Sequence, residues 1–163
     1  MKRSLITCLF CMLLSGIHAQ SSYFKGEWTK VGTQELFNGI VKITEKDNSM
    51  VSVEIIWTYL AIDSSQQDMI SMYKGKKGRM GLEIATGTYD KKTNDIYFEG
   101  KEKKDPYNVI GLDKYQLKFS RDKQVLYGKS DANGNNNGLF FAARISTAEG
   151  IKKFTSAKKL LIK

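Results

Sequence analysis

The run Val51-Ser52-Val53-Glu54-Ile55-Ile56-Trp57-Thr58-Tyr59 alternates between apolar and polar side chains. Its odd-numbered positions are all apolar, and its even-numbered positions are polar except for Ile56. Successive side chains of a β-strand point to opposite faces of a sheet. The run therefore predicts a strand with one face in a dry core and the other in water.

Short runs of the same kind recur along most of the chain, at 23–29, 37–44, 82–89, 96–101, 110–119, 125–130 and 139–145. Residues typical of turns separate several of them, at 46–49, 90–94 and 121–123. Consecutive hairpins favour an all-β fold, an antiparallel up-and-down barrel of about eight strands, because closure removes the exposed sheet edges. A β-sandwich is the alternative.

The first 19 residues have the pattern of a secretory signal peptide. Lys2 and Arg3 precede an apolar stretch at 5–14, and small residues follow up to Ala19. The apolar stretch is shorter than the roughly 20 residues that a membrane-spanning helix needs. We therefore expect cleavage after Ala19 and an exported protein, in the periplasm, at the cell surface or outside the cell. The rest would comprise a barrel domain and a C-terminal segment, at 20–147 and 148–163.

Cys8, Cys11 and His18 are the only cysteines and the only histidine in the sequence, and all three lie in the predicted leader. A processed chain would lack the side chains that form disulfides, zinc or haem sites and Ser-His-Asp triads. We expect neither a metal nor another cofactor. This composition favours a non-catalytic protein, and a hydrolase that works with carboxylates alone is the alternative.

Positive charge is concentrated at the C-terminus. The sequence carries a formal net charge of +9, and the last 15 residues, from Glu149 onward, contribute +4 of it. The remainder lacks the dense basic face of a nucleic-acid-binding protein, so we expect no nucleic acid as a partner. The basic segment 148–163 suits an amphipathic helix or a short final strand at 159–163, and its charge favours peripheral contact with an anionic envelope surface. Its large apolar residues are Ile151, Phe154, Leu161 and Ile162.

Two short stretches resemble known families. Gly26-Glu27-Trp28 resembles the Gly-x-Trp start of the first strand in lipocalins and related small barrels, the calycins. That resemblance implies that the Trp28 ring closes one barrel end and that Arg144, from the last strand, stacks on it as a cation–π pair. The segment 138–163 loosely resembles the C-terminal sorting signals of secreted proteins in the Bacteroidetes, with a Gly-x-aromatic strand followed by a turn at Gly150.

Aromatic residues on the predicted strands are the candidates for a ligand site, namely Trp57, Tyr59, Tyr115, Phe119 and Tyr127. Asp113 shares the strand parity of Tyr115 and is a candidate polar anchor, or a carboxyl with a shifted pKa. The same rings would suit a filled core, and Asp113 would equally suit a position in solvent. The predicted function is non-catalytic binding of a small apolar or aromatic ligand in the barrel, or of a protein partner at its rim.

The segment 61–80 breaks the strand rhythm and is expected to form a long loop with a short helix. It contains four cations beside two glycines, which makes Lys74, Lys76, Lys77 and Arg79 candidate anion-binding residues, with a solvated turn as the alternative. An alternative function is therefore a secreted enzyme inhibitor or immunity-type protein that acts through this loop. The stretch 131–138 lacks the glycine and the bidentate glutamate of an EF-hand, so it predicts a turn. We expect a monomer.

Overall fold

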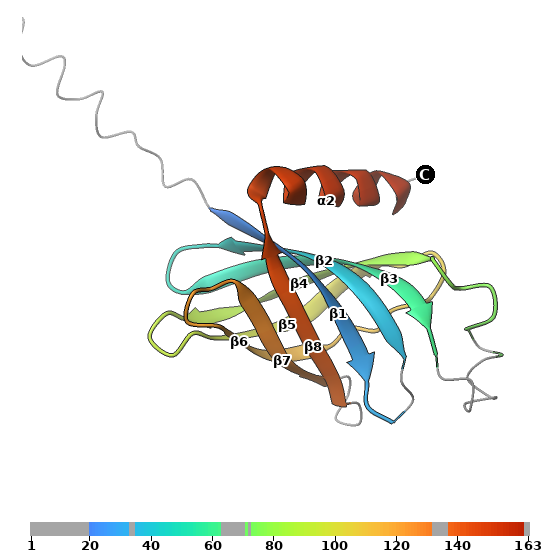
Figure 1. The fold of residues 1–163 in the computed structure, drawn as a ribbon, viewed down its shortest axis with the longest axis horizontal. Coiled ribbons are helices and arrows are strands. Elements are labelled where there is room, and N and C mark those ends of the chain that lie inside the picture. Colours follow the sequence, from blue (N-terminus) through green and yellow to red (C-terminus); the bar gives the residue numbers. More distant parts are fainter. Residues whose placement is uncertain (1–19, 33–34, 63–70, 72, 132–136, 162–163) are drawn as a thin grey trace, which may run out of the picture.

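The computed structural model describes residues 20–32, 35–62, 71, 73–131 and 137–161 (Figure 1). The predicted signal peptide at 1–19 lies outside the described residues, as do 63–70 of the predicted long loop and 132–136 of the predicted turn. Within the described part of the chain, no helix combines the length and the apolar character needed to cross a membrane.

Eight antiparallel strands form a closed barrel, and each strand pairs with the next one in the sequence. β8 also pairs with β1, with Phe140 opposite Trp28, so the sheet closes on itself. The predicted up-and-down barrel is confirmed, and the sandwich alternative is wrong. The strands are β1 (Ser21–Lys30), β2 (Leu36–Glu45), β3 (Met50–Ala61), β4 (Met80–Asp90), β5 (Asp95–Lys104), β6 (Lys114–Phe119), β7 (Val125–Asp131) and β8 (Asn137–Ile145).

The two ends of the barrel differ in how the strands are connected. The β2–β3, β4–β5 and β6–β7 connections are the three turns expected from the sequence, and they lie together at the left of Figure 1. Asn48 and Asn94 occupy them with φ angles of 59° and 63°, a conformation that asparagine tolerates better than most residues. The described parts of the other connections, among them 73–79 and 105–113, lie at the opposite end, which we call the open end.

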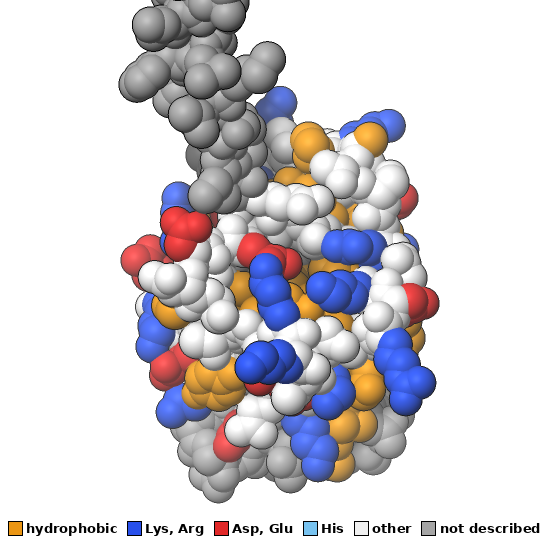
Figure 2. Space-filling model, turned by 90° about the vertical axis from the view of Figure 1, so that its left-hand side faces the viewer, with side chains coloured by type: hydrophobic (Ala, Val, Ile, Leu, Met, Phe, Trp, Pro, Cys, Tyr) orange, Lys and Arg blue, Asp and Glu red, His pale blue; other side chains and the backbone are white. Residues whose placement is uncertain are grey.

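Aromatic side chains fill the tight-turn end. The centre of the Phe119 ring lies 5.7 Å from that of Phe24 and 5.2 Å from that of Tyr89. The Lys123 ammonium lies 5.3 Å from the Tyr89 ring centre, and the Arg144 guanidinium lies 5.6 Å from the Phe24 ring centre. Figure 2 shows this end, with basic side chains beside and over apolar atoms. Packed rings beneath cations therefore close this end of the barrel.

The helix α2 (Thr147–Leu161) lies on the outside of the barrel, across β1–β4. The helical alternative for the C-terminal segment is thus confirmed, and the alternative of a strand at 159–163 is wrong. Phe154 packs with Tyr23, Ile56 and Leu82 on the outer face of the sheet. Ile56, the exception in the alternating run, is only 1% exposed because it lies beneath the helix.

Polar contacts and one close approach hold α2 against the barrel wall. Lys158 Nζ donates a hydrogen bond to Glu54 Oε1 over 2.6 Å, and Lys42 Nζ donates to Oε2 over 3.0 Å. Burial would raise the pKa of Glu54, but the two lysines outweigh burial and lower it. Gly150 faces Tyr23 so closely that a Cβ atom at this position would overlap the ring. The helix can approach the sheet this closely only with glycine there.

Candidate ligand-binding cavity

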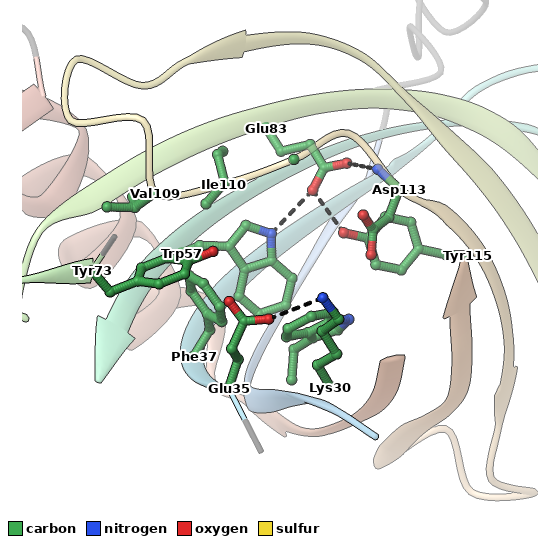
Figure 3. A pocket seen from close by; sticks show the side chains of 12 residues that line it. Lys30, Glu35, Phe37, Trp57, Tyr73, Glu83, Val109, Ile110, Asp113 and Tyr115 are labelled. Carbon is green, nitrogen blue, oxygen red and sulfur yellow. Dashed lines mark hydrogen bonds and ion pairs between the residues drawn. The ribbon is translucent and has the colours of Figure 1, made fainter. Parts of the chain in front are cut away.

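A cavity of about 210 Å³ lies at the open end of the barrel. Its walls combine aromatic rings with three carboxyl groups, drawn from β1–β4, β6 and the connections beside them (Figure 3). The lining residues are Trp28, Lys30, Glu35, Phe37, Trp57, Tyr73, Glu83, Val109, Ile110, Gly111, Asp113 and Tyr115.

Asp105 shapes the β5–β6 connection so that Val109 and Ile110 reach the cavity. Its Oδ1 accepts a hydrogen bond from the Val109 N–H over 2.9 Å, and its Oδ2 accepts one from the Ile110 N–H over 2.8 Å. Lys103 Nζ lies 3.6 Å from the same carboxylate and donates to the Ile110 carbonyl over 2.6 Å. Val109 and Ile110 are consequently buried although they lie outside any strand.

Glu83, on β4, is the most buried of the three lining carboxyl groups, at 1% exposed. The Trp57 indole N–H and the Tyr115 hydroxyl donate to its Oε2 over 3.0 and 2.7 Å, and the Asp113 N–H donates to Oε1 over 3.2 Å (Figure 3). All three donors are uncharged. Burial outweighs these hydrogen bonds and raises the pKa of Glu83 to about 7. Glu83 therefore titrates near neutral pH.

The sheet makes room for the Glu83 carboxyl at Gly100 of β5, where a Cβ atom would overlap Glu83 Oε1. The pairing of β4 with β5 shifts register beside Glu83, with Lys101 as the extra residue on β5. Such β-bulges bend a strand and are frequent next to functional sites. The Gly100 N–H also donates to the Asp113 carbonyl over 2.9 Å, which ties the β5–β6 connection to the same place.

Asp113 lies directly before β6 and is 8% exposed. Ser130 Oγ of β7 donates to its Oδ2 over 2.6 Å, and the Trp28 indole N–H of β1 donates to Ser130 Oγ over 2.6 Å. Burial raises the pKa of Asp113, although the Ser130 hydrogen bond acts against this. A chain of hydrogen bonds from three parts of the barrel thus fixes the carboxyl in place.

Lys30 and Glu35 flank the β1–β2 connection and form an ion pair, with 3.4 Å between Lys30 Nζ and Glu35 Oε2. Glu35 is 3% exposed, so the pair is largely shielded from water. Burial and a hydrogen bond with Glu35 raise the pKa of Tyr73, and its hydroxyl stays protonated. Among the described lining residues, Lys30 is the one cation, and its charge is offset by Glu35.

The structure brings three of the six predicted ligand-binding residues to the cavity: Trp57, Asp113 and Tyr115. Tyr59 is buried but lies outside the lining and stacks on Tyr73, with 4.8 Å between ring centres. Phe119 belongs to the aromatic cluster at the tight-turn end. The filled-core alternative therefore holds for one end of the barrel, whereas the other end keeps a cavity.

The prediction that Tyr127 lines the interior is wrong. Leu126 points inward and is fully buried, whereas Tyr127 is 44% exposed. Tyr127 pairs with Phe141 of β8, which is also exposed on the outer face of the barrel. Because Leu126 and Tyr127 are neighbouring apolar residues, the alternation within 125–130 does not decide which of them faces the core.

The cation–π pair implied by the lipocalin resemblance is not formed. The β1–β8 register places Arg144 opposite Phe24, while the partner of Trp28 is Phe140. Arg144 accordingly stacks over Phe24, at the tight-turn end. Trp28 lies at the open end, where it lines the cavity and donates to Ser130, so the expectation that its ring closes a barrel end is also wrong.

Two of the four candidate anion-binding cations hold the segment before β4 against the β5–β6 connection. Lys76 Nζ donates to the Asn108 carbonyl over 2.9 Å and lies 4.9 Å from the Tyr73 ring centre. Arg79 lies 4.3 Å from the Tyr107 ring centre. Lys74 and Lys77 are exposed. Anion binding by these residues stays a prediction.

Glu83 is the main site residue that sequence reasoning missed. It shares strand parity with Ala85 and Tyr89, which face the core, and this is the signal that marks it as inward. Leu82 and Ile84 have the opposite parity and point outward, but they are also apolar because α2 covers them. The alternation along β4 is therefore unclear from the sequence. Lys30 and Glu35 lie at the ends of a connection, where alternation gives no direction.

The fold and the cavity define this protein as an eight-stranded antiparallel barrel with one filled end and one hollow end. No protein-family model, curated protein or solved structure matches the chain.

Proposed function

We propose that this protein is a non-catalytic binding protein that takes a small aromatic or apolar ligand into the cavity at the open end. The observation that carries the proposal is a space of about 210 Å³ between aromatic rings, in a barrel whose opposite end is filled. A cavity of roughly 150 Å³ accommodates benzene, so the cavity suits a single ring with a short substituent. Typical pockets for drug-sized ligands are larger, about 300–1,000 Å³.

The setting of the carboxyl groups supports binding more than catalysis. Glu83 accepts hydrogen bonds from three protein groups, and Asp113 accepts one from Ser130. These bonds tie both carboxyls to neighbouring strands, as expected for groups that orient a ligand in a rigid pocket. Export, expected from the first 19 residues, is part of this proposal, so the ligand would be met outside the cytoplasm.

Intrinsic fluorescence gives a direct test, because both tryptophans of the sequence, Trp28 and Trp57, line the cavity. We expect titration with benzyl alcohol to change the fluorescence in a saturable way. Glycerol, which has no apolar body to bury between the rings, should cause no saturable change.

A variant that adds a large side chain at the border of the cavity locates the binding. Gly111→Leu should weaken benzyl alcohol binding by about tenfold or more, because a Cβ atom at Gly111 meets no atom nearer than Asp113 Oδ1 at 3.6 Å. Gly111 is exposed and lines the cavity, so the added side chain would stand beside Asp113 at the solvent-facing border of the cavity and should obstruct the ligand there. Ala143→Leu, at an exposed position of β8, is the matched control. Equal affinities in the two variants would contradict binding in this cavity.

A further inference from the structure

Two of the three carboxyl groups that line the cavity lack a cationic partner. None of the ion pairs formed among the described residues includes Glu83 or Asp113. Lys30, the one cation of the described lining, is paired with Glu35, and it lowers the pKa of Asp113 less than burial raises it. Buried carboxylates are normally paired with a cation or bound to a metal, so these two carboxyls, when ionised, leave a need for positive charge in the cavity.

Asp113 also has unused hydrogen-bonding capacity. Within the described part of the chain, the one hydrogen bond of its carboxyl group is at Oδ2, from Ser130. Its Oδ1 lies 3.6 Å from where a Cβ atom of Gly111 would stand, and Gly111 is itself a lining residue. An ionised carboxylate accepts hydrogen bonds at both oxygens. A donor inside the cavity would therefore complete the hydrogen bonding of a carboxyl that is more than nine-tenths buried.

We propose that the cavity selects an aromatic ligand that carries an ammonium group, with the Asp113 carboxylate as the contact for that group. This inference rests on the proposed function. The aromatic walls favour such a ligand in two ways. They bury its ring, and the faces of their rings attract its cation. An ammonium donates up to three hydrogen bonds, which suits Asp113 Oδ1 and the remaining acceptor capacity of Glu83. A carboxylate ligand would face uncompensated negative charge.

The donor set favours an organic cation over a metal ion. No three carboxyl, histidine or cysteine side chains in the described residues are grouped closely enough to hold a metal. The indole of Trp57 and the hydroxyl of Tyr115 also occupy the Glu83 oxygen that they share. A flat ring with a short ammonium arm matches both the volume and the mixture of apolar and acidic groups.

Proton linkage gives the selectivity a pH dependence. The ionisable groups around Glu83 are Asp113, Tyr115 and, across the cavity, Lys30, Glu35 and Tyr73. The negative charge of Asp131 also acts on Asp113 and raises its pKa. Burial raises the pKa of both Glu83 and Asp113, and an ammonium beside them would lower it again. Protonation of Glu83, whose pKa is about 7, therefore competes with ammonium binding, which weakens as the pH falls below that value.

Three ligands of one size and different charge test the proposal on the native protein: benzylammonium, benzyl alcohol and benzoate. Tryptophan fluorescence at about pH 8 should show benzylammonium binding about tenfold tighter than benzyl alcohol, as expected for a hydrogen bond to a charged group, with benzoate weakest. At about pH 5.5 the benzylammonium affinity should fall, and the benzyl alcohol affinity should not.

The outcomes separate the inference from the proposed function. If benzyl alcohol binds as tightly as benzylammonium, or more tightly, selection by charge is overturned and the aromatic ligand site stands. If none of the three ligands binds in a saturable way, the proposed function itself fails. Neither result depends on a variant.

The contact residue is tested with Asp113→Asn, which keeps the shape and the acceptor for Ser130 but removes the charge. The preference for benzylammonium over benzyl alcohol should shrink from about tenfold to about one, while benzyl alcohol binding is retained. Glu27→Gln, at an exposed position of β1, is the control and should keep the full preference. An unchanged preference in Asp113→Asn would overturn the assignment of Asp113, and a thermal melt verifies that the variant is folded.

Discussion

Among single residues, Glu83 combines a structural and an electrostatic role. Its carboxyl links β3, β4, β6 and the β5–β6 connection through hydrogen bonds with Trp57, Tyr115 and Asp113. Burial disfavours its charged form, and the three uncharged donors offset this only in part, which leaves the pKa at about 7. The folded protein therefore keeps a proton on Glu83 at pH values where the unfolded chain, with a pKa of 4.5, releases it.

We predict that the free energy of unfolding decreases as the pH rises from about 5 to about 8. A proton held more tightly in the folded state stabilises the fold below the unfolded pKa, and this stabilisation is lost as the pH passes through the folded pKa. The shift of Glu83 corresponds to a loss on the order of 3 kcal/mol. The raised pKa of Asp113 contributes with the same sign. Thermal melts across this range measure the effect.

Glu83→Gln should remove most of this pH dependence, because the amide keeps the size of the side chain and cannot ionise. Glu27→Gln provides the control, since Glu27 is exposed on the outer face of β1. The same pH profile in native protein and in Glu83→Gln would show that another group is responsible.

Among the elements, helix α2 changes the burial pattern of the strands beneath it. Ile56 and Leu82 point outward and are still only 1% exposed, because the helix covers them. The amphipathic pattern of 148–163 suited a helix or a short strand, and in the helix that forms its apolar residues do not all face the barrel. Phe154 is 5% exposed, whereas Ile151 is 51% exposed. The docked face is set by the close approach at Gly150 as well as by the apolar residues.

Gly150→Ala should destabilise the protein by about 1–3 kcal/mol, because the new methyl group would overlap the Tyr23 ring. The direction of the change in stability is informative, since replacing glycine by alanine in an exposed helix normally stabilises a protein by about 1 kcal/mol. Chemical denaturation measures the difference. Ser156→Ala, at an exposed position of α2, should change stability by no more than about 0.5 kcal/mol. A stabilised Gly150→Ala protein would mean that α2 does not pack on Tyr23.

The whole molecule has a filled tight-turn end, an open end with the cavity, and one wall that helix α2 covers. In an up-and-down barrel, alternate connections lie at the same end. The three tight turns therefore lie together at the tight-turn end, where Phe24, Tyr89 and Phe119 pack inside the barrel. Described residues of the β1–β2, β3–β4 and β5–β6 connections meet at the open end and supply part of the cavity lining. Topology alone thus collects the candidate site from segments far apart in the sequence.

A chain that ends at Ser146 should lose at least about 3 kcal/mol of unfolding free energy, because Tyr23, Ile56 and Leu82 would become exposed to water. The loss should be similar at about 0.1 M and about 1 M salt, since apolar contacts are not screened. Denaturant titrations at both salt concentrations measure it. A loss that disappears at high salt would assign the docking of α2 to the Lys158–Glu54 ion pair, and unchanged stability would show that the segment is separable.

The sequence by itself predicted the strands and the tight turns, favoured a barrel over a sandwich, and left the C-terminal segment as either a helix or a short strand. These follow from local patterns, because alternation and turn chemistry act between residues close together in the chain. Parity also placed Trp57 and Tyr115 inward, and it made an inward position one of two alternatives for Asp113. Parity was insufficient for Tyr127, where two apolar residues adjoin and only pairing with β8 decides which faces the core.

Only the tertiary structure decided where the cavity lies and which groups meet in it. Glu83 faces the core because α2 covers the outer side of β4, and a bulge with Gly100 leaves room for its carboxyl. Arg144 stacks on Phe24 and not on Trp28 because the closing β1–β8 register sets that pairing. These outcomes depend on contacts between residues distant in the chain, and no local pattern encodes such contacts.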